Sequence, residues 1–270
     1  MIRHSSRIRS GARRLAIRYF RAALVLGVLL AIGAAWSTHV MAVARLRERL
    51  LLTPADTVAQ QPQLVRMAAA QARPLFARHC ATCHGATMQG NPATGAPNLV
   101  DGVWLYGSGS VFDIERTILY GVRAETPKSR NITEMPPFGL TGILRPGEIS
   151  EVVQYLLQLS GRPHDGQAAL AGRDLFLGRG NCVDCHGPDG RGNSDYGAPD
   201  LTANVWNSGG DAAAIYDSIY SGRHRVMPGW IQQLTLQQIR ALAVFIHANS
   251  HPADTGAAGA ASHAATIANR

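Results

Sequence analysis

The 270-residue sequence predicts an all-α protein with one N-terminal membrane helix followed by two similar helical domains in tandem. Three observations predict this fold. A run without acidic or basic residues extends from Ala22 to Ala44. A Cys-x-x-Cys-His motif occurs twice, with Cys80 and Cys182 at the first positions. Each copy is followed by a segment whose apolar residues recur at helical spacing, the second of them around Leu242.

The apolar run, residues 22–44, is long enough to cross a bilayer. As a helix it would extend about 35 Å, against a hydrocarbon core of about 30 Å. Residues 1–21 carry seven Arg and no acidic residue, so the positive-inside rule predicts a cytoplasmic N-terminus. A secretory signal peptide is the alternative, because Ala42-Val43-Ala44 matches a small-x-small cleavage site. Both interpretations deliver residues 45–270 to the outer side of the cytoplasmic membrane.

The formal net charge of +8 belongs to the N-terminal end of the chain. Residues 1–50 carry ten of the 26 basic residues and one of the 18 acidic residues, which leaves the remainder close to neutral. A nucleic-acid-binding domain needs a basic patch on its folded surface. The charge distribution therefore predicts no nucleic-acid partner.

Each Cys-x-x-Cys-His motif is the attachment sequence of a c-type haem. The two thiols would form thioether bonds to one porphyrin, and the adjacent His would be the proximal ligand of the iron. A zinc site or a redox-active thiol pair are the alternatives, but a His directly after both pairs favours haem. The sequence thus predicts two covalently bound haem c groups, one held by Cys80, Cys83 and His84 and one by Cys182, Cys185 and His186.

A methionine is the expected sixth iron ligand, because ligation by Met and His suits electron transfer. Met135 and Met227, each followed by Pro, lie at equivalent places in the two copies. The repeat pairs Met135 with His84 and Met227 with His186. His224 is the rival ligand at the second haem, and an ordinary core Met is the alternative interpretation of both methionines.

The repeat has an offset of 102 residues that sets the domain boundaries. The offset joins Pro97 to Pro199 and Trp104 to Trp206, whereas Met135 and Met227 differ by only 92. The first copy therefore has about nine extra residues within 123–134, which we expect to form a surface loop. The predicted order is a basic N-terminus at 1–21, the anchor at 22–44, a connector at 45–65, domains at 66–160 and 167–250, and a disordered tail at 251–270.

Beyond the haem motifs, six further stretches are characteristic of one family. They are Gly95-Ala96-Pro97-Asn98-Leu99, Val103-Trp104-Leu105-Tyr106-Gly107, Met135-Pro136-Pro137-Phe138-Gly139, Gly197-Ala198-Pro199-Asp200-Leu201, Val205-Trp206 and Met227-Pro228-Gly229-Trp230. With these stretches the chain resembles the dihaem subunit III of cbb3-type cytochrome c oxidases, the CcoP/FixP family. The resemblance covers about residues 52–250. The chain lacks the Asn-Pro-Leu-Pro-Arg-Trp-Trp motif that many members carry ahead of their anchor.

This resemblance implies two tandem class I cytochrome c domains, in which the carbonyls of Pro97 and Pro199 orient the proximal histidines. It implies no catalytic site in this chain, but transfer of electrons from a cytochrome c or cytochrome bc-complex donor to a haem–copper oxidase that reduces oxygen and pumps protons. The implied location is the bacterial inner membrane, with the haem domains in the periplasm. A dihaem subunit of a periplasmic dehydrogenase is the main alternative. A gas-binding sensor is a third, and it would require an open sixth position on the iron.

Overall fold

The structure is a computed structural model that describes residues 5–131, 133–204 and 206–251. These residues form ten helices, α1 to α10, and their β-type pairing is confined to isolated bridges. The all-α prediction is confirmed. The chain divides into two compact units, residues 1–49 and 50–270. The predicted tail, apart from its first residue, lies outside the described residues.

Helix α1 (Ser5–Leu52) contains the predicted anchor. A candidate membrane span covers Tyr19–Leu52, with a mean hydropathy of 1.8 and no buried residue in its most apolar window. Large side chains such as Leu30 and Trp36 are 66% and 70% exposed. The helix continues beyond residue 44 into the expected connector, because Leu, Arg and Glu in residues 45–52 are strong helix formers.

The first haem motif lies between two longer helices. Helix α3 (Pro62–His79) begins with Pro62, where a proline costs no hydrogen bond, and it ends directly before Cys80. The motif itself forms the single turn α4 (Ala81–His84). Helix α5 (Val111–Tyr120) is capped by Ser110, whose hydroxyl accepts a hydrogen bond from the backbone of Asp113.

The second motif has the same surroundings. Helix α7 (Gly166–Leu177) is capped by Asp165 and precedes the turn α8 (Val183–His186). Helix α9 (Ala212–Ser221) is capped by Asp211 and corresponds to α5. The short helix α2 (Ala55–Val58) has no counterpart before α7.

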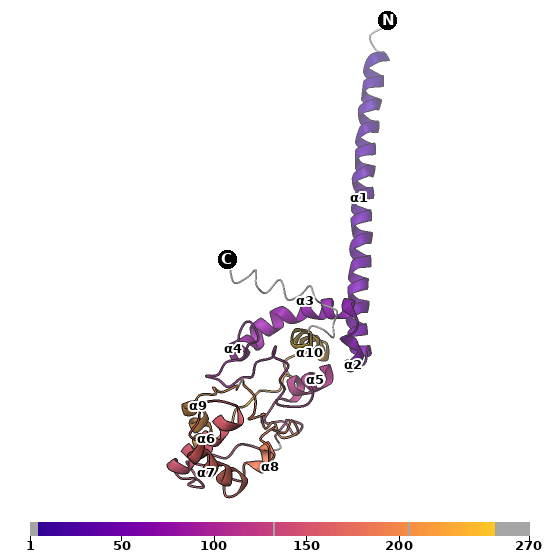
Figure 1. Cartoon of the computed structure of the whole chain (residues 1–270). Helices are drawn as coiled ribbons and strands as arrows, with labels where there is room; N and C mark the ends of the chain where they lie inside the picture. Colours follow the sequence, from indigo (N-terminus) through magenta and orange to yellow (C-terminus); the bar gives the residue numbers. More distant parts are fainter. Residues whose placement is uncertain (1–4, 132, 205, 252–270) are drawn as a thin grey trace. The chain divides into compact units, whose positions relative to one another are not determined.

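The two terminal helices are exchanged between the repeats. Helix α6 (Pro146–Leu159) follows the first haem motif in sequence but packs against α7 and α9, which flank the second motif. Helix α10 (Leu236–Ser250) follows the second motif but packs against α3 and α5 (Figure 1). The rings of Phe76 in α3 and Phe245 in α10 meet edge to face, 6.3 Å apart. We call α3, α4, α5 and α10 the first half and α6 to α9 the second half.

This exchange differs from the domains predicted at 66–160 and 167–250, in which each repeat would close on its own terminal helix. The short connection between α6 and α7, residues 160–165, brings these two helices together as neighbours. Gly172 allows their close approach, because a Cβ there would lie 2.0 Å from the carbonyl oxygen of Glu151. The buried core around α6 accordingly includes Phe176 of α7 and Ile215 of α9.

Backbone hydrogen bonds between crossing segments join the two repeats. The backbone N–H of Val122, after α5, donates to Met227 O at 2.9 Å, and Met227 N–H donates back to Val122 O at 3.0 Å. After α9, the N–H of Arg223 donates to Met135 O at 3.1 Å. Gly121 and Gly222 precede these contacts with φ near +75° and +71°, and a Cβ at either would strike the carbonyl of the paired Met. We call α5 and α9, which lie between the haem motif and the Met of each repeat, the middle helices. Each Met segment is therefore tied to the end of the middle helix of the other repeat.

The nine-residue insertion is not simply a surface loop. Arg130 folds inward, with its side chain only 10% exposed. Its guanidinium pairs with Asp113 at 3.1 Å and donates to the hydroxyl of Thr117 at 3.1 Å, both in α5. A charged residue in a polar loop is buried here because a carboxylate in the helix beneath it supplies a partner.

Candidate functional site

The two Cys-x-x-Cys-His motifs form equivalent turns. In each, the backbone N–H of the His donates to the carbonyl of the first Cys at 2.9 Å, His84 to Cys80 and His186 to Cys182. One helical turn thus carries a thiol at its start and an imidazole at its end. Thr94 in the loop after the first motif donates to the carbonyl of Cys83 at 3.4 Å.

Both imidazoles contact a proline carbonyl through Nδ1. The distance is 3.1 Å from His84 to Pro97 O and 3.0 Å from His186 to Pro199 O. A carbonyl oxygen can only accept, so each Nδ1 carries the proton and Nε2 keeps a free lone pair. Burial lowers the pKa of both imidazoles, against the opposite effect of the proline carbonyls. Each His is therefore a neutral side chain with Nε2 available for a metal.

The first thiol of each pair lies in surroundings that disfavour the thiolate. Burial, and secondarily the neighbouring Cys83, raises the pKa of the Cys80 thiol to about 11. Burial likewise raises the pKa of Cys182 to about 11. A redox-active cysteine needs the opposite shift, because the thiolate is the nucleophile. Within the described residues, no three His, Cys, Asp or Glu side chains are grouped so that they could hold a metal ion such as zinc.

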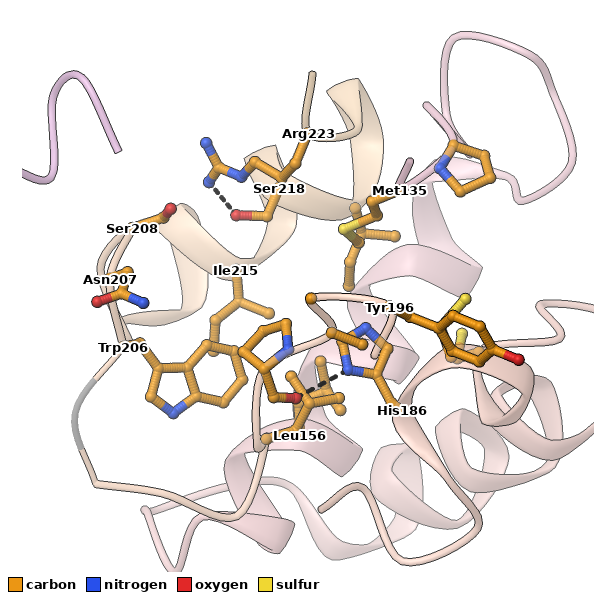
Figure 2. Close-up of a pocket in the computed structure, with 18 of the residues that line it drawn as sticks. Met135, Leu156, His186, Tyr196, Trp206, Asn207, Ser208, Ile215, Ser218 and Arg223 are labelled. Carbon is orange, nitrogen blue, oxygen red and sulfur yellow. Dashed lines mark hydrogen bonds between the residues drawn. The ribbon is translucent and has the colours of Figure 1, made fainter. Parts of the chain in front are cut away.

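A cavity of about 530 Å³ opens at His186 (Figure 2). Figure 2 shows Met135 and His186 approaching it from different segments, with Trp206, Ile215 and Leu156 on its walls. Most of the lining is apolar, as a porphyrin ring requires. The lining side chains include Phe138, Val152, Leu156, Phe176, Leu201, Trp206, Ile215 and Ile219.

Met135, and not Met227, lies at this cavity. Met135 lines it together with Cys182, Cys185 and His186, and packs against the core of the second half. Met227 is instead bound through its backbone to Val122, in the half that carries His84. The repeat predicted that Met135 would accompany His84 and that Met227 would accompany His186. The structure instead places Met135 at the cavity of His186. The difference follows from the exchange of the terminal helices, because each Met segment leads into a terminal helix, Met135 into α6 and Met227 into α10.

His224, the rival ligand for the second haem, is engaged elsewhere. Its Nδ1 lies 2.7 Å from a carboxylate oxygen of Glu134, and both side chains are about half exposed. It does not line the cavity at His186. This contact crosses between the repeats, as the Met segments do.

The structure adds two cavity residues, Arg223 and Ser218, that the sequence did not single out. Arg223 and Ser218 line the cavity and contact each other through the guanidinium and the hydroxyl. Trp206 also lines it and donates its indole N–H to Ala203 O at 2.8 Å, whereas the corresponding N–H of Trp104 is buried without an acceptor among the described residues. Beyond Trp206 the offset between the repeats is 101 residues, and it aligns Ser218 with Thr117. This alignment was the only sequence signal for Ser218, but it does not show where the side chains meet.

Two thiol pairs, each followed by a neutral His on a proline carbonyl, define a c-type cytochrome. A family model described as cytochrome c matches residues 69–160, and one described as cytochrome C oxidase, cbb3-type, subunit III matches residues 167–246. The chain belongs to the CcoP/FixP family, subunit III of the cbb3-type oxidases. It is an electron-transfer subunit of an oxidase complex and not the catalytic subunit.

Curated relatives carry this assignment. The chain is 39% identical over 204 residues to the cbb3-type cytochrome c oxidase subunit CcoP of Cereibacter sphaeroides, covering 76% of this chain and 69% of the relative. It is 42% identical over 191 residues to the subunit FixP of Bradyrhizobium sp. strain ORS 278, covering 70% of this chain and 64% of that one. CcoP of Rhodobacter capsulatus is 39% identical over 208 residues. These relatives favour the oxidase over a periplasmic dehydrogenase.

Proposed function

We propose that this chain holds two haem c groups in one compact unit and carries electrons from a c-type cytochrome donor, or from a cytochrome bc complex, to the core of a cbb3-type oxidase. The observation that carries the proposal is the duplicated turn, with its thiol pair and its imidazole held through Nδ1. Bound haem would supply one-electron chemistry at the iron. The chain supplies ligands, orientation and exclusion of water.

The residues present fit haem c at both turns. Cys80 and Cys83 would attach one group, and Cys182 and Cys185 the other. At the second turn, the cavity beside His186 has an apolar lining and a thioether sulfur from Met135. The proline carbonyls would keep each proximal imidazole in the tautomer that leaves Nε2 free and would raise its basicity as a ligand.

The axial ligands are proposed to cross between the repeats. His186 and Met135 would hold one iron, and His84 and Met227 the other. The support is the placement of Met135 in the lining of the cavity at His186 and the two backbone hydrogen bonds that join Met227 to Val122. With this pairing, each iron would be held by one residue from each repeat.

Single-haem proteins test this pairing. In Cys182→Ser/Cys185→Ser, haem remains only at Cys80 and Cys83. We expect Met227→Ala to convert its low-spin spectrum to high spin and to open it to CO, and Met135→Ala to leave it unchanged. In Cys80→Ser/Cys83→Ser the two methionines should exchange roles. The opposite assignment in both proteins would restore the pairing within each repeat.

The membrane placement is also a proposal. Helix α1 would anchor the chain by one span, with the Arg-rich residues 1–21 in the cytoplasm and the haem-binding unit in the periplasm. A protease added to intact spheroplasts should then digest residues 50–250 and spare the N-terminus. Digestion from the other side only would reverse the orientation.

Purified complexes test the electron route. We expect the wild-type chain to co-purify with a copper–haem catalytic subunit and to support oxygen consumption with reduced cytochrome c as donor. The Cys182→Ser/Cys185→Ser chain should still co-purify but should lose most of this activity. Full activity in that variant, measured with the complex intact, would contradict the proposed route.

A further inference from the structure

The proline that orients the second proximal histidine ends a small closed loop. Residues 193–199 form this loop, which we call the second orienting loop. Within it, Asn193 N–H donates to Ala198 O at 2.9 Å, and Ala198 N–H donates back to Asn193 O at 3.0 Å. The carbonyl of Pro199 follows directly and lies 3.0 Å from Nδ1 of His186 (Figure 2). The position of the loop therefore sets the position of the carbonyl that holds the imidazole.

The first repeat contacts the second orienting loop at two points. The ring of Tyr106 lies against Gly197, where an added Cβ would strike the phenol. The backbone N–H of Gly107 donates to Ser194 O at 3.4 Å. Gly197 has φ near +71° and no side chain, so an aromatic ring can lie directly on its backbone. The first repeat thus touches the loop two residues before Pro199.

Two arginines of the first repeat hold Tyr106 in this place. Arg123 donates to its hydroxyl at 3.0 Å, and the guanidinium of Arg130 lies over its ring, 5.6 Å from the centroid. Arg130 is itself fixed by its pair with Asp113 at 3.1 Å. Both arginines belong to residues 123–134, the segment that contains the nine-residue insertion. The insertion therefore supports the side chain with which the first repeat meets the second.

The equivalent loop of the first repeat is held differently. The 102-residue offset places Ser208 where the first repeat has Tyr106, so the second repeat has no ring to offer in return. The glycine at the corresponding place is Gly95, and the group next to it is the guanidinium of Arg225, which donates to Ala93 O at 3.3 Å. An arginine side chain has more rotatable bonds than a tyrosine, whose ring is fixed by two χ angles. The ring contact is therefore specific to the second orienting loop.

We propose that Tyr106 of the first repeat is a positioning residue for the proximal ligand of the second haem. Its ring fixes the second orienting loop, and the loop in turn keeps the carbonyl of Pro199 on Nδ1 of His186. The inference rests on the proposed function, because it concerns haem attached at Cys182 and Cys185. A hydrogen bond to the second ring nitrogen fixes the orientation of a ligating imidazole and raises its basicity. Loss of the ring should therefore loosen this hydrogen bond, although no residue of the second repeat has changed.

The exchange of the Nδ1 proton of each proximal histidine with solvent tests the proposal. It is measured by NMR on the reduced, isotope-labelled full-length protein in detergent, with the two signals assigned from the single-haem proteins. We expect Tyr106→Ser, which gives the first repeat the residue type of the second, to speed exchange at His186 by about tenfold, because a neutral hydrogen bond then opens more often. Exchange at His84 should stay as in the wild type, although Tyr106 is nearer to His84 in sequence.

Two further variants show which part of Tyr106 acts. Tyr106→Phe keeps a ring on Gly197 and loses only the hydroxyl, so it should retain the slow exchange at His186. Exchange in Tyr106→Phe as fast as in Tyr106→Ser would overturn the role of the ring. Tyr120→Ser is the matched control, because it removes another half-buried ring of the first repeat, one that lies 5.3 Å from Nζ of Lys128 in the inserted loop. It should leave exchange at His186 unchanged.

Tyr106→Leu provides the test if Tyr106→Ser does not fold. It keeps apolar bulk but not the flat ring, and it should also speed exchange at His186. Unchanged exchange at His186 in a folded variant that carries both haems would overturn the inference and leave the proposed function intact. Faster exchange confined to His84 would overturn it as well. A wild-type chain without covalent haem at Cys182 and Cys185 would instead sink the proposed function.

Discussion

At each haem motif, one hydrogen bond sets the chemistry of the imidazole. The proline carbonyl accepts a hydrogen bond from Nδ1, which fixes the orientation of the imidazole ring and leaves the lone pair of Nε2 free. Burial at the same place disfavours the imidazolium. The carbonyl thus fixes the tautomer, and burial outweighs the opposite effect of the carbonyl on the pKa, so that the imidazoles are neutral.

The side chain of Asp113 is the best-connected carboxylate of the first half. It accepts from the backbone and hydroxyl of Ser108 at 2.8 and 2.9 Å and from Arg130 at 3.1 Å. Burial alone would raise its pKa, but the hydrogen bonds from Ser108 and Arg130 outweigh burial and lower it. This residue therefore connects α5, the turn before it and the inserted loop.

We predict that Asp113→Asn lowers the free energy of unfolding by about 1–3 kcal/mol at pH 7, because hydrogen bonds to a charged group are lost. A lowered folded-state pKa means that the stabilisation is complete above the unfolded-state pKa, about 3.9. It is lost as the pH falls through the folded-state pKa. Urea unfolding at a series of pH values should show the wild-type advantage shrinking below pH 4.

The exposed carboxylate of Asp189 is the matched control. Asp189→Asn should change the unfolding free energy by less than about 0.5 kcal/mol. A loss in Asp113→Asn that stayed constant down to pH 2 would argue that the change acts through packing and not through charge.

At the scale of elements, the contact between α6 and α7 depends on one glycine. A Cβ on Gly172 would lie 2.0 Å from Glu151 O, a backbone atom that cannot move aside. We predict that Gly172→Ala destabilises the protein by about 1–3 kcal/mol, although Ala is the better helix former. Thermal unfolding measures the effect.

Gly147 in α6 is the control for helix propensity. No atom lies within 4 Å of the Cβ that would be added there. Gly147→Ala should therefore stabilise the protein by about 0.4–1 kcal/mol. Equal effects in the two variants would mean that the α6–α7 contact does not limit the space at Gly172.

The end of α1 belongs to the folded core of the second compact unit. Leu50 is fully buried, and Arg240 of α10 donates to Leu50 O at 3.3 Å and to Thr53 O at 2.9 Å. A chain that starts at residue 45 should keep this packing. A chain that starts at residue 53 should lose about 1.5–3 kcal/mol, the value of one buried Leu side chain. Equal unfolding midpoints for the two chains would contradict this boundary.

At the scale of the whole molecule, the exchanged helices make each half depend on both repeats. Leu242 in α10 is fully buried in the first half, although it follows the second haem motif. Leu156 in α6 is buried in the core of the second half, although it precedes that motif. A substitution of Leu242 or Leu156 should therefore destabilise the half against which its helix packs and not the half that is nearer in sequence.

We predict that Leu242→Ala costs about 2–5 kcal/mol and raises amide hydrogen exchange mainly in α3 and α5. Leu156→Ala should raise it mainly in α7 and α9. Exchange measured by mass spectrometry distinguishes the two patterns. The reverse assignment, with α5 responding to Leu156→Ala, would support two repeats that fold separately.

Most of the site was predictable from local chemistry. The thiol pairs, the following histidines and the 13-residue spacing to Pro97 and Pro199 lie within single loops. The contact between each proline carbonyl and its imidazole was implied by the family resemblance. The middle and terminal helices were also predictable, because apolar spacing and capping residues act over a few residues.

Only the tertiary structure placed Met135 at the cavity of His186. Two homologous terminal helices carry nearly equivalent apolar faces, so the pattern along α6 fits the core of either half. The choice depends on the short connection from α6 to α7, on the close approach at Gly172 and on the backbone pairing of Met135 with Arg223. The sequence by itself determined the two Cys-x-x-Cys-His turns, the histidines proposed as proximal ligands and one candidate membrane helix. The partner of each turn was decided by packing between residues far apart in the chain.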